Sequence, residues 1–162
     1  MNNQFFKIKS LGTVKTTNME WKLVFNPEFK DALTGLDGFS HVQVLFWLHL
    51  HDTPDFRKTI KCNKPYTKGP EELGIFATRS DYRPNPLGLS ICQVKNIDIK
   101  KGIISLFYID AEDATPVIDI KPYHPGVDRV KNASVPEWCS HWPEWYEDSA
   151  VFDWSSEFNF PE

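Results

Sequence analysis

Cysteine is scarce in this 162-residue chain, which has three cysteines and no C-x-x-C pair. An odd number of cysteines without metal-ligand spacing is typical of a reducing compartment, so we expect a cytoplasmic protein. Long apolar runs are also missing, because the longest, from Val42 to Leu50, contains Gln43 and His49, whereas a membrane span needs roughly 18 apolar residues. The first residues lack a signal-peptide pattern. We therefore expect a soluble protein without a membrane contact.

Lysine and arginine are absent from residues 133–162, which contain seven acidic residues and four of the six tryptophans. The preceding residues carry a small positive excess, and the formal net charge of the chain is −4. An acidic total argues against indiscriminate nucleic-acid binding but leaves room for a local basic face. We expect a barrel domain at residues 1–132 and an acidic, aromatic tail at 133–162 that packs on the barrel or on a dimer partner.

Helical signals are few, and alternating apolar residues predict a mainly β protein. Asn26 and Pro27 begin one short helix that Gly35 ends. A hairpin is expected from 91–99 to 103–110, with its turn at Lys100, Lys101 and Gly102. Further strands are predicted at 5–14, 21–25, 41–50 (buried on both faces), 75–78 and 117–120, with a surface loop at 52–73. About seven strands favour a small single β-barrel that buries its own core, and the missing G-x-G-x-x-G turn counts against a Rossmann domain.

The segment from Gly74 to Ser90 contains two prolines that hold Asn85 in an extended conformation. Arg79 and Arg83 lie on the same segment. Two guanidinium groups on a rigid loop suit a carboxylate, phosphate or nucleotide ligand. The alternative is a stiff surface turn whose arginines pair with a nearby aspartate or with water.

Two other groups of polar residues have competing interpretations. Four acidic residues between Asp110 and Asp119 offer oxygen ligands, but the segment lacks the glycine of a calcium loop, which favours an acidic turn. His49 and His51 alternate on the expected strand and suit a metal, but a third histidine at suitable spacing is missing. A structural or ligand-contacting role is favoured for both histidines, and we expect no metal.

Five basic residues and no acid lie between Phe56 and Pro70: Arg57, Lys58, Lys61, Lys64 and Lys68. On an exposed loop, they form either a phosphate-contacting patch or an ordinary solvated surface. The chain has no G-x-S-x-G elbow to support a serine nucleophile. The catalytic residues stay unassigned.

Two long motifs carry a family resemblance. Residues 74–90 read GIFATRSDYRPNPLGLS and residues 110–123 read DAEDATPVIDIKPY. Both resemble the signatures of the TsaA-like (TrmO-type) family, and residues 35–41, GLDGFSH, resemble a third family segment. The likeness spans about residues 8–130.

The resemblance implies a β-barrel that binds S-adenosylmethionine, usually as a homodimer. The activity it implies is methylation of N6 of threonylcarbamoyladenosine beside the tRNA anticodon. By motif, the cofactor contacts fall on His49, Leu50, Arg79, Leu89, Thr115, Pro116, Val117 and Ile118. The expected substrate contacts are Arg83, Asn85, Lys121 and Tyr123, and the basic stretch 57–68 is expected to meet the anticodon stem-loop.

The chain departs from the family pattern at three places. Ala114 replaces a usual glycine, only Lys15 to Glu20 separate the first two strands, and a short tail replaces an additional C-terminal domain. These departures leave two alternatives open. One is methylation of a small molecule by the same cofactor, and the other is a non-catalytic ligand-binding or metal-dependent barrel.

Overall fold

The computed structural model describes residues 4–159. Within them the chain forms two compact units. One contains the residues up to Asp52 together with Asn85–Arg129, and the other contains Thr53–Pro84 together with the residues from Val130 onward. Among the described residues, no helix has both the length and the apolar character needed to cross a membrane.

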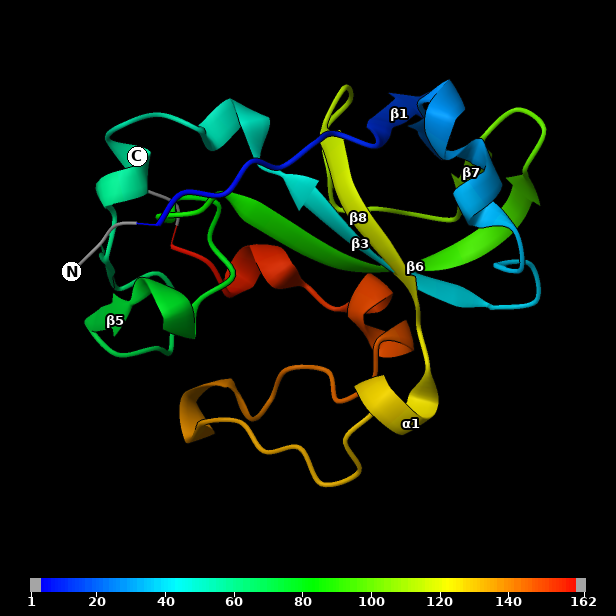
Figure 1. Cartoon of the computed structure of the whole chain (residues 1–162). Coiled ribbons are helices and arrows are strands. Elements are labelled where there is room, and N and C mark those ends of the chain that lie inside the picture. The colour runs from blue at the N-terminus through cyan, green and yellow to red at the C-terminus, as the bar shows by residue number, and fades with distance from the viewer. Residues whose placement is uncertain (1–3, 160–162) are drawn as a thin grey trace. The chain divides into compact units, whose positions relative to one another are not determined.

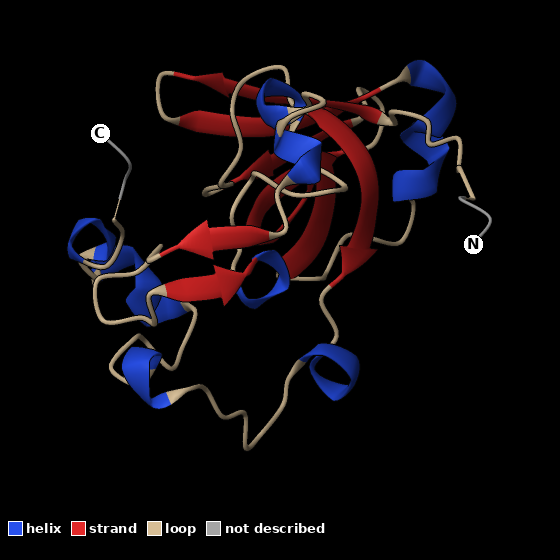
Figure 2. Ribbon diagram, turned by 90° about the vertical axis from the view of Figure 1, so that its left-hand side faces the viewer, coloured by secondary structure: helices blue, strands red, loops and turns tan. Residues whose placement is uncertain are grey.

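The first unit is a closed barrel of six antiparallel strands, which confirms the mainly β, barrel prediction (Figures 1 and 2). The order around the barrel is β1-β2-β7-β6-β3-β8. Closure leaves no unpaired sheet edge, so every strand is hydrogen-bonded on both sides. The strands are β1 (Gly12–Thr17), β2 (Glu20–Phe25), β3 (His41–Trp47), β6 (Leu87–Asp98), β7 (Ile103–Leu106) and β8 (Pro116–Pro122).

Side chains that alternate along the strands fill the barrel interior. On β3, Val42, Val44 and Phe46 are buried, whereas Gln43 and Leu45 between them are partly exposed. The prediction of a strand buried on both faces was therefore wrong, because a small barrel has one interior face and one outer face. The same alternation places the following fully buried residues in the core: Val14, Leu23, Cys92, Ile104 and Val117.

The turns of the barrel follow local sequence signals closely. Gly102 has φ +68° in the turn between β6 and β7, which confirms the predicted hairpin. The expected short helix is the 3-10 helix η1 (Pro27–Leu33), followed by Gly35 at φ +82°. Asn26 does not cap it, since its side-chain amide donates to the Ser10 carbonyl. β1 begins at Gly12 and not at residue 5, and a single turn, α1 (Pro125–Asp128), follows β8.

Short elements form the second unit. Part of the segment 52–73, expected to be a surface loop, is therefore regular secondary structure. Its strands β4 (Lys61–Asn63) and β5 (Glu72–Gly74) pair as an antiparallel hairpin. The strand expected at 75–78 was wrong: Ile75–Ala77 is the 3-10 helix η4, because Thr78 donates both its N–H and its hydroxyl to the Ile75 carbonyl. The remaining 3-10 helices of this unit are η3 (Phe56–Lys58), η5 (Glu137–Cys139), η6 (Glu147–Val151) and η7 (Trp154–Ser156).

The tryptophans of the tail pack within this second unit. The ring of Tyr66 stacks on Trp138 at 5.1 Å between centroids and meets the edge of Trp142 at 5.2 Å. Trp142 in turn lies 5.4 Å from Trp154. The tail thus shares an aromatic core with residues 53–84. The expected domain boundary at residue 132 and the contact of the tail with the barrel or a dimer partner stay predictions.

Candidate functional site

The 3-10 helix η2 (His49–His51) follows β3. Both signature segments contact the chain at the start of this helix. The Leu48 N–H at its start donates to the carbonyl of Pro86, at 2.8 Å, in the first signature. The His49 Nδ1 atom lies 3.4 Å from the hydroxyl of Thr115, in the second signature. Thr115 is buried, and its carbonyl accepts from the Val14 N–H at 2.8 Å. Two segments separated in sequence therefore meet at the adjacent residues Leu48 and His49.

The other predicted cofactor residues of the barrel differ in what they present to a ligand. Leu50 and Leu89 are 59% and 46% exposed, which is unusual for leucine and leaves apolar surface available. Pro116 and Ile118 are half-buried. Val117 is fully buried in the core, so its side chain cannot reach a ligand on the outer face of the barrel.

A shallow pocket of about 140 Å³ lies on the outer face of strands β3, β6 and β8. Leu45 is at its centre, directly opposite Leu89 on β6 and Asp119 on β8. Pockets that enclose small ligands measure about 300–1,000 Å³, so this pocket holds only part of such a ligand. Its lining residues are Gln43, Leu45, Leu89, Asp119, Ile120 and Lys121.

Four of these lining residues were missed as ligand contacts: Gln43, Leu45, Asp119 and Ile120. The signal that finds most of them is the two-residue period of β3 and β8, which places Gln43 and Leu45 on the outer face beside Asp119 and Lys121. The carboxylate of Asp119 lies 2.6 Å from the Lys121 ammonium and raises the pKa of this lysine. The ion pair with Asp119 therefore stabilises the charged form of Lys121.

Tyr123 and Asn85, both predicted substrate contacts, are outside the lining of this pocket. Tyr123 donates its N–H to the His41 carbonyl at 3.0 Å, and its ring meets the edge of the His41 ring. Asn85 is exposed, and its carbonyl accepts from the Leu87 N–H at 2.7 Å. The structure therefore brings neither side chain to the pocket.

The arginine segment belongs to the second unit and is held by hydroxyl groups. The Thr78 hydroxyl accepts from the Ser80 N–H, and the Ser80 hydroxyl accepts from the Tyr82 N–H, each at 3.2 Å. Ser80 thus caps a backbone N–H group of this segment. These bonds define the backbone on both sides of Arg79, whose side chain is exposed, and lead to Arg83, which is half-buried.

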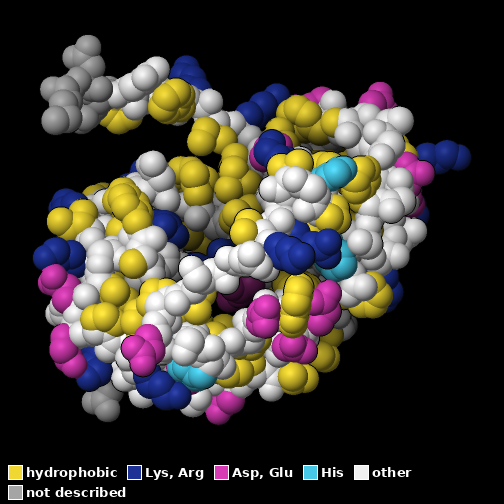
Figure 3. All heavy atoms as spheres, turned by 90° about the horizontal axis from the view of Figure 1, so that it is seen from below, with side chains coloured by type: hydrophobic (Ala, Val, Ile, Leu, Met, Phe, Trp, Pro, Cys, Tyr) yellow, Lys and Arg dark blue, Asp and Glu magenta, His cyan; other side chains and the backbone are white. Residues whose placement is uncertain are grey.

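The basic stretch 57–68 is not a free cationic patch. Lys58 pairs with Asp55 at 2.9 Å, Lys61 with Glu72 at 2.7 Å and Lys64 with Glu71 at 2.6 Å. All three acids lie outside the stretch, and folding of the β4–β5 hairpin supplies two of them. On the face seen in Figure 3, Lys and Arg side chains are likewise dispersed among Asp and Glu side chains. The structure favours the solvated, ion-paired surface for these lysines.

The described residues contain no group of three His, Cys, Asp or Glu side chains arranged for an ion. His49 and His51 lie on a 3-10 helix, so the premise that they alternate on a strand was wrong. In the acidic turn, Asp113 accepts from the Thr16 N–H at 3.0 Å and pairs with Lys15. The backbone donor is the main reason that the pKa of Asp113 is lowered.

Ala114 has φ +62°, a left-handed conformation that glycine adopts without strain. An L-residue there costs about 1–2 kcal/mol, partly offset by the entropy that glycine loses on folding. We expect Ala114→Gly to raise the free energy of unfolding by up to about 1 kcal/mol, measured by urea denaturation. Ala133→Gly, at an exposed tail position, is the control and should be neutral or slightly destabilising. If Ala114→Gly lowers the free energy of unfolding as much as Ala133→Gly does, the backbone at Ala114 is not strained.

Comparison with known proteins places this geometry in a family. The family model described as the tRNA-methyltransferase O N-terminal domain matches residues 11–129. The tRNA (adenine(37)-N6)-methyltransferase of Escherichia coli (strain K12) is 39% identical over 125 residues, which are 76% of this chain and 52% of the relative. A probable S-adenosyl-L-methionine-binding protein of Methanocaldococcus jannaschii is 34% identical over 126 residues, 78% of this chain and 98% of that protein.

Solved structures agree with the sequence comparison. The crystal structure of TrmO from Pseudomonas aeruginosa superimposes with a TM-score of 0.65 at 29% identity, over 82% of this chain and 62% of that chain. By the sequence comparison above, the chain spans about half the length of the Escherichia coli relative. The matched residues include the barrel strands and both signature segments. The chain belongs to the tRNA-methyltransferase O N-terminal domain family.

Proposed function

We propose that the protein is an S-adenosylmethionine-dependent N-methyltransferase that acts on N6 of the modified adenosine beside the tRNA anticodon. The observation that carries this proposal is that both family signatures contact the adjacent residues Leu48 and His49, Pro86 through the Leu48 N–H and Thr115 through the His49 ring. The names of relatives from Escherichia coli, mouse and methanogenic archaea support the cofactor and the substrate.

The residues of the barrel fit the chemistry of this cofactor. S-adenosylmethionine supplies a methyl group activated by a positively charged sulfur. Its adenine and alkyl parts need apolar surface, which the exposed leucines Leu50 and Leu89 offer. Its carboxylate needs a cation, and we assign the exposed guanidinium of Arg79 to it. The hydroxyl of Thr115 lies 3.4 Å from Nδ1 of His49 and orients this ring, and we assign the ring to the adenosine part.

The chain's own residues contribute mainly orientation to the reaction. Methyl transfer requires the acceptor nitrogen to be held in line with the methyl carbon at about 3–3.5 Å. We assign Lys121, which is paired with Asp119 at 2.6 Å, and Arg83 to the anionic groups of the substrate. Solvent accepts the proton that the nitrogen loses, so the proposal needs no side-chain base.

A homodimer in the cytoplasm forms part of the proposal. The outer-face pocket of about 140 Å³ is too small to enclose the cofactor alone. A second copy that packs on the same face would close the pocket and bury the exposed Leu89. A cytoplasmic location agrees with a tRNA substrate. It also agrees with the small number of cysteines, which is typical of proteins in a reducing compartment.

Calorimetric titration with S-adenosylmethionine tests the proposal, alone and with anticodon stem-loop RNA that is unmodified or threonylcarbamoylated. We expect one cofactor per chain and an RNA signal that depends on the modification, followed by methyl transfer to that RNA. If the purified protein binds no cofactor, the proposed function is wrong. Sedimentation of the same samples reports the oligomeric state.

The second candidate is methyl transfer to a small molecule. Three lysines of the stretch expected to contact RNA form ion pairs with acidic side chains, which makes this stretch less suited to bind phosphates. The salt dependence of RNA binding separates the candidates, since each phosphate contact steepens the loss of affinity with added salt. Cofactor binding without any RNA affinity would favour the small molecule.

A further inference from the structure

The 3-10 helix η3 contacts the residues on both sides of Arg83 within the second unit. The ring of Phe56 packs on the ring of Tyr82, with 4.3 Å between their centroids and an interplanar angle of 36°. The guanidinium of Arg57, the next residue of η3, donates from Nη1 to the carbonyl of Pro84 at 3.4 Å. Tyr82 and Pro84 are the chain neighbours of Arg83. One short helix therefore contacts both neighbours of this arginine.

The backbone of η3 is itself defined by several hydrogen bonds. The Phe56 N–H donates to the Thr53 hydroxyl at 3.2 Å, and the Arg57 N–H donates to the Thr53 carbonyl at 3.0 Å. The Thr59 N–H donates to the Phe56 carbonyl at 3.1 Å and closes the turn. Both side chains that reach the arginine segment are half-buried. Phe56 and Arg57 are therefore presented from a turn with a fixed backbone.

The segment that receives these contacts is restricted in its own conformation. Pro84 has a fixed φ and disfavours a helical conformation at Arg83. The Ser80 hydroxyl accepts from the Tyr82 N–H at 3.2 Å. The bond from Arg57 adds a charged donor, which makes a stronger hydrogen bond than a neutral one. Arg83 thus lies between two neighbours that are each held by another part of the unit.

This arrangement gives Arg57 a different role from the one expected for the basic stretch 57–68. The sequence suggested a phosphate contact for Arg57, but its guanidinium donates to a backbone carbonyl of the arginine segment. The planar guanidinium has several donors in a fixed geometry and is well suited to such a contact. The structure favours a supporting role for this side chain.

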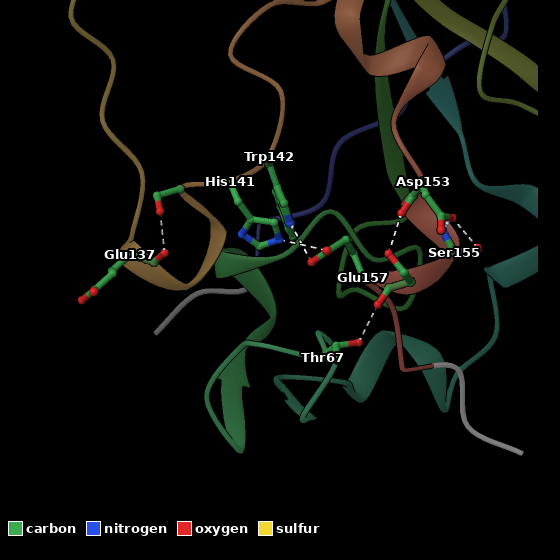
Figure 4. A network of polar contacts seen from close by, with 9 residues as sticks. Thr67, Glu137, His141, Trp142, Asp153, Ser155 and Glu157 are labelled. Carbon is green, nitrogen blue, oxygen red and sulfur yellow. Dashed lines mark hydrogen bonds and ion pairs between the residues drawn. The ribbon is translucent and has the colours of Figure 1, made fainter.

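A separate network anchors the tail of the same unit. Glu157 is 5% exposed and accepts from the Trp142 indole N–H at 3.0 Å, and the His141 Nε2 atom lies 2.8 Å from its other oxygen (Figure 4). The Thr67 hydroxyl donates to the Ser156 carbonyl at 2.9 Å. These contacts join the tail to the loop between β4 and β5, whereas η3 contacts the arginine segment. Substitutions can therefore test the two parts of the unit separately.

We propose that Phe56 and Arg57 are positioning residues, which hold both neighbours of Arg83 and so set its place for binding the anionic groups of the RNA substrate. This inference rests on the proposed function, which assigns Arg83 to those groups. Phe56 and Arg57 act through Arg83 and need no contact with RNA of their own. The proposal separates Arg57 from the three lysines of the basic stretch, which pair with acids on the surface.

Phe56→Leu and Arg57→Ala test the proposal with the full-length protein and threonylcarbamoylated anticodon stem-loop RNA. We expect the KM for this RNA to rise about fivefold in each variant, the effect of one lost hydrogen bond or ring contact. Amide exchange at Arg83 should become faster. The kcat and the dissociation constant for S-adenosylmethionine should not change, because the lost contacts act on substrate binding alone.

The control is Phe152→Leu, which removes a ring that lies 4.8 Å from Trp154 in the tail. Like Phe56→Leu, it loses an aromatic contact of the second unit and should lower the free energy of unfolding. It should leave both the KM for RNA and the exchange at Arg83 unchanged. An equal rise of KM in Phe152→Leu would mean that the stability of the unit, and not the place of Arg83, causes the loss, and the proposal would be wrong.

A second comparison uses Arg83→Ala as the background. There neither Phe56→Leu nor Arg57→Ala should raise KM further, because all three residues act in series. If Arg57→Ala keeps its full effect and lowers the salt dependence of RNA binding by about one phosphate contact, Arg57 binds RNA directly and the proposal is overturned. An unchanged KM in both single variants would also overturn it. A wild-type protein that binds no S-adenosylmethionine, or does not methylate the RNA, would instead overturn the proposed function, and this inference with it.

Discussion

Arg79→Ala is expected to weaken S-adenosylmethionine binding about 100-fold, with little change in the melting temperature. Hydrogen bonds between charged groups, such as a guanidinium and a carboxylate, contribute about 1.5–3 kcal/mol each. The Arg79 side chain is exposed, while the backbone on both sides of it is held by hydrogen bonds of Thr78 and Ser80. Alanine therefore removes the cation without disturbing the turn.

Calorimetry on Arg79→Ala measures this effect, and Lys58→Ala is the matched control. Lys58 is an exposed cation of the same unit, but it pairs with Asp55 on the surface. Its removal should leave cofactor affinity unchanged, since exposed pairs contribute about 0–1 kcal/mol. Equal affinity of Arg79→Ala and wild type would remove Arg79 from the cofactor site and shift its role to the carboxylate of the threonyl group on the RNA.

Gly12→Ala is expected to lower the free energy of unfolding by about 3 kcal/mol, the upper end of overpacking effects. A Cβ atom on Gly12 would lie 2.3 Å from the Val24 carbonyl oxygen and 2.8 Å from the Phe25 Cα. Both are backbone atoms of β2, which is paired with β1 on one side and β7 on the other. The closed barrel therefore leaves neither strand free to move away.

Gly74→Ala is the control for this substitution, measured by urea unfolding of both variants. A Cβ atom on Gly74 meets no other described atom within 4 Å, and φ is −63°, which alanine adopts readily. We expect no loss, or a gain of up to about 1 kcal/mol from the lower entropy of the unfolded chain. Equal stability of the two variants would show that β1 and β2 can separate without cost.

Local signals predicted the barrel strands well where the chain alternates or turns. The hairpin around Gly102 and the strand at 117–120, within β8, follow from positive φ at glycine and from the two-residue period. The same signals gave a wrong prediction at residues 75–78, where a polar side chain forms a hydrogen bond that replaces the bonds of a strand. Thr78 bonds the Ile75 carbonyl and converts an expected strand into η4.

In the candidate site, too, features that depend on adjacent residues were predicted, whereas contacts between residues distant in sequence were not. The two motifs and their family are evident from consecutive residues, because each is a rigid segment defined by its own prolines and turns. Their meeting at Leu48 and His49 is not evident, since it depends on the β1–β8 pairing that places Thr115 beside His49. The outer-face residues Gln43 and Asp119 were missed for a related reason: they are distant in sequence and become neighbours only across β3 and β8.

Local patterns were sufficient to predict the fold class, the family and the short rigid segments, because each depends on periodicity or on backbone preferences of adjacent residues. Which side chains neutralise one another, and which rings pack together, depends on contacts that form only in the folded chain. Lys61 and Lys64 form a basic stretch in sequence but lie beside Glu72 and Glu71 in the folded hairpin. Tyr66 joins tail tryptophans more than 70 residues away. Such contacts arise from packing over long separations in sequence, for which no local pattern exists.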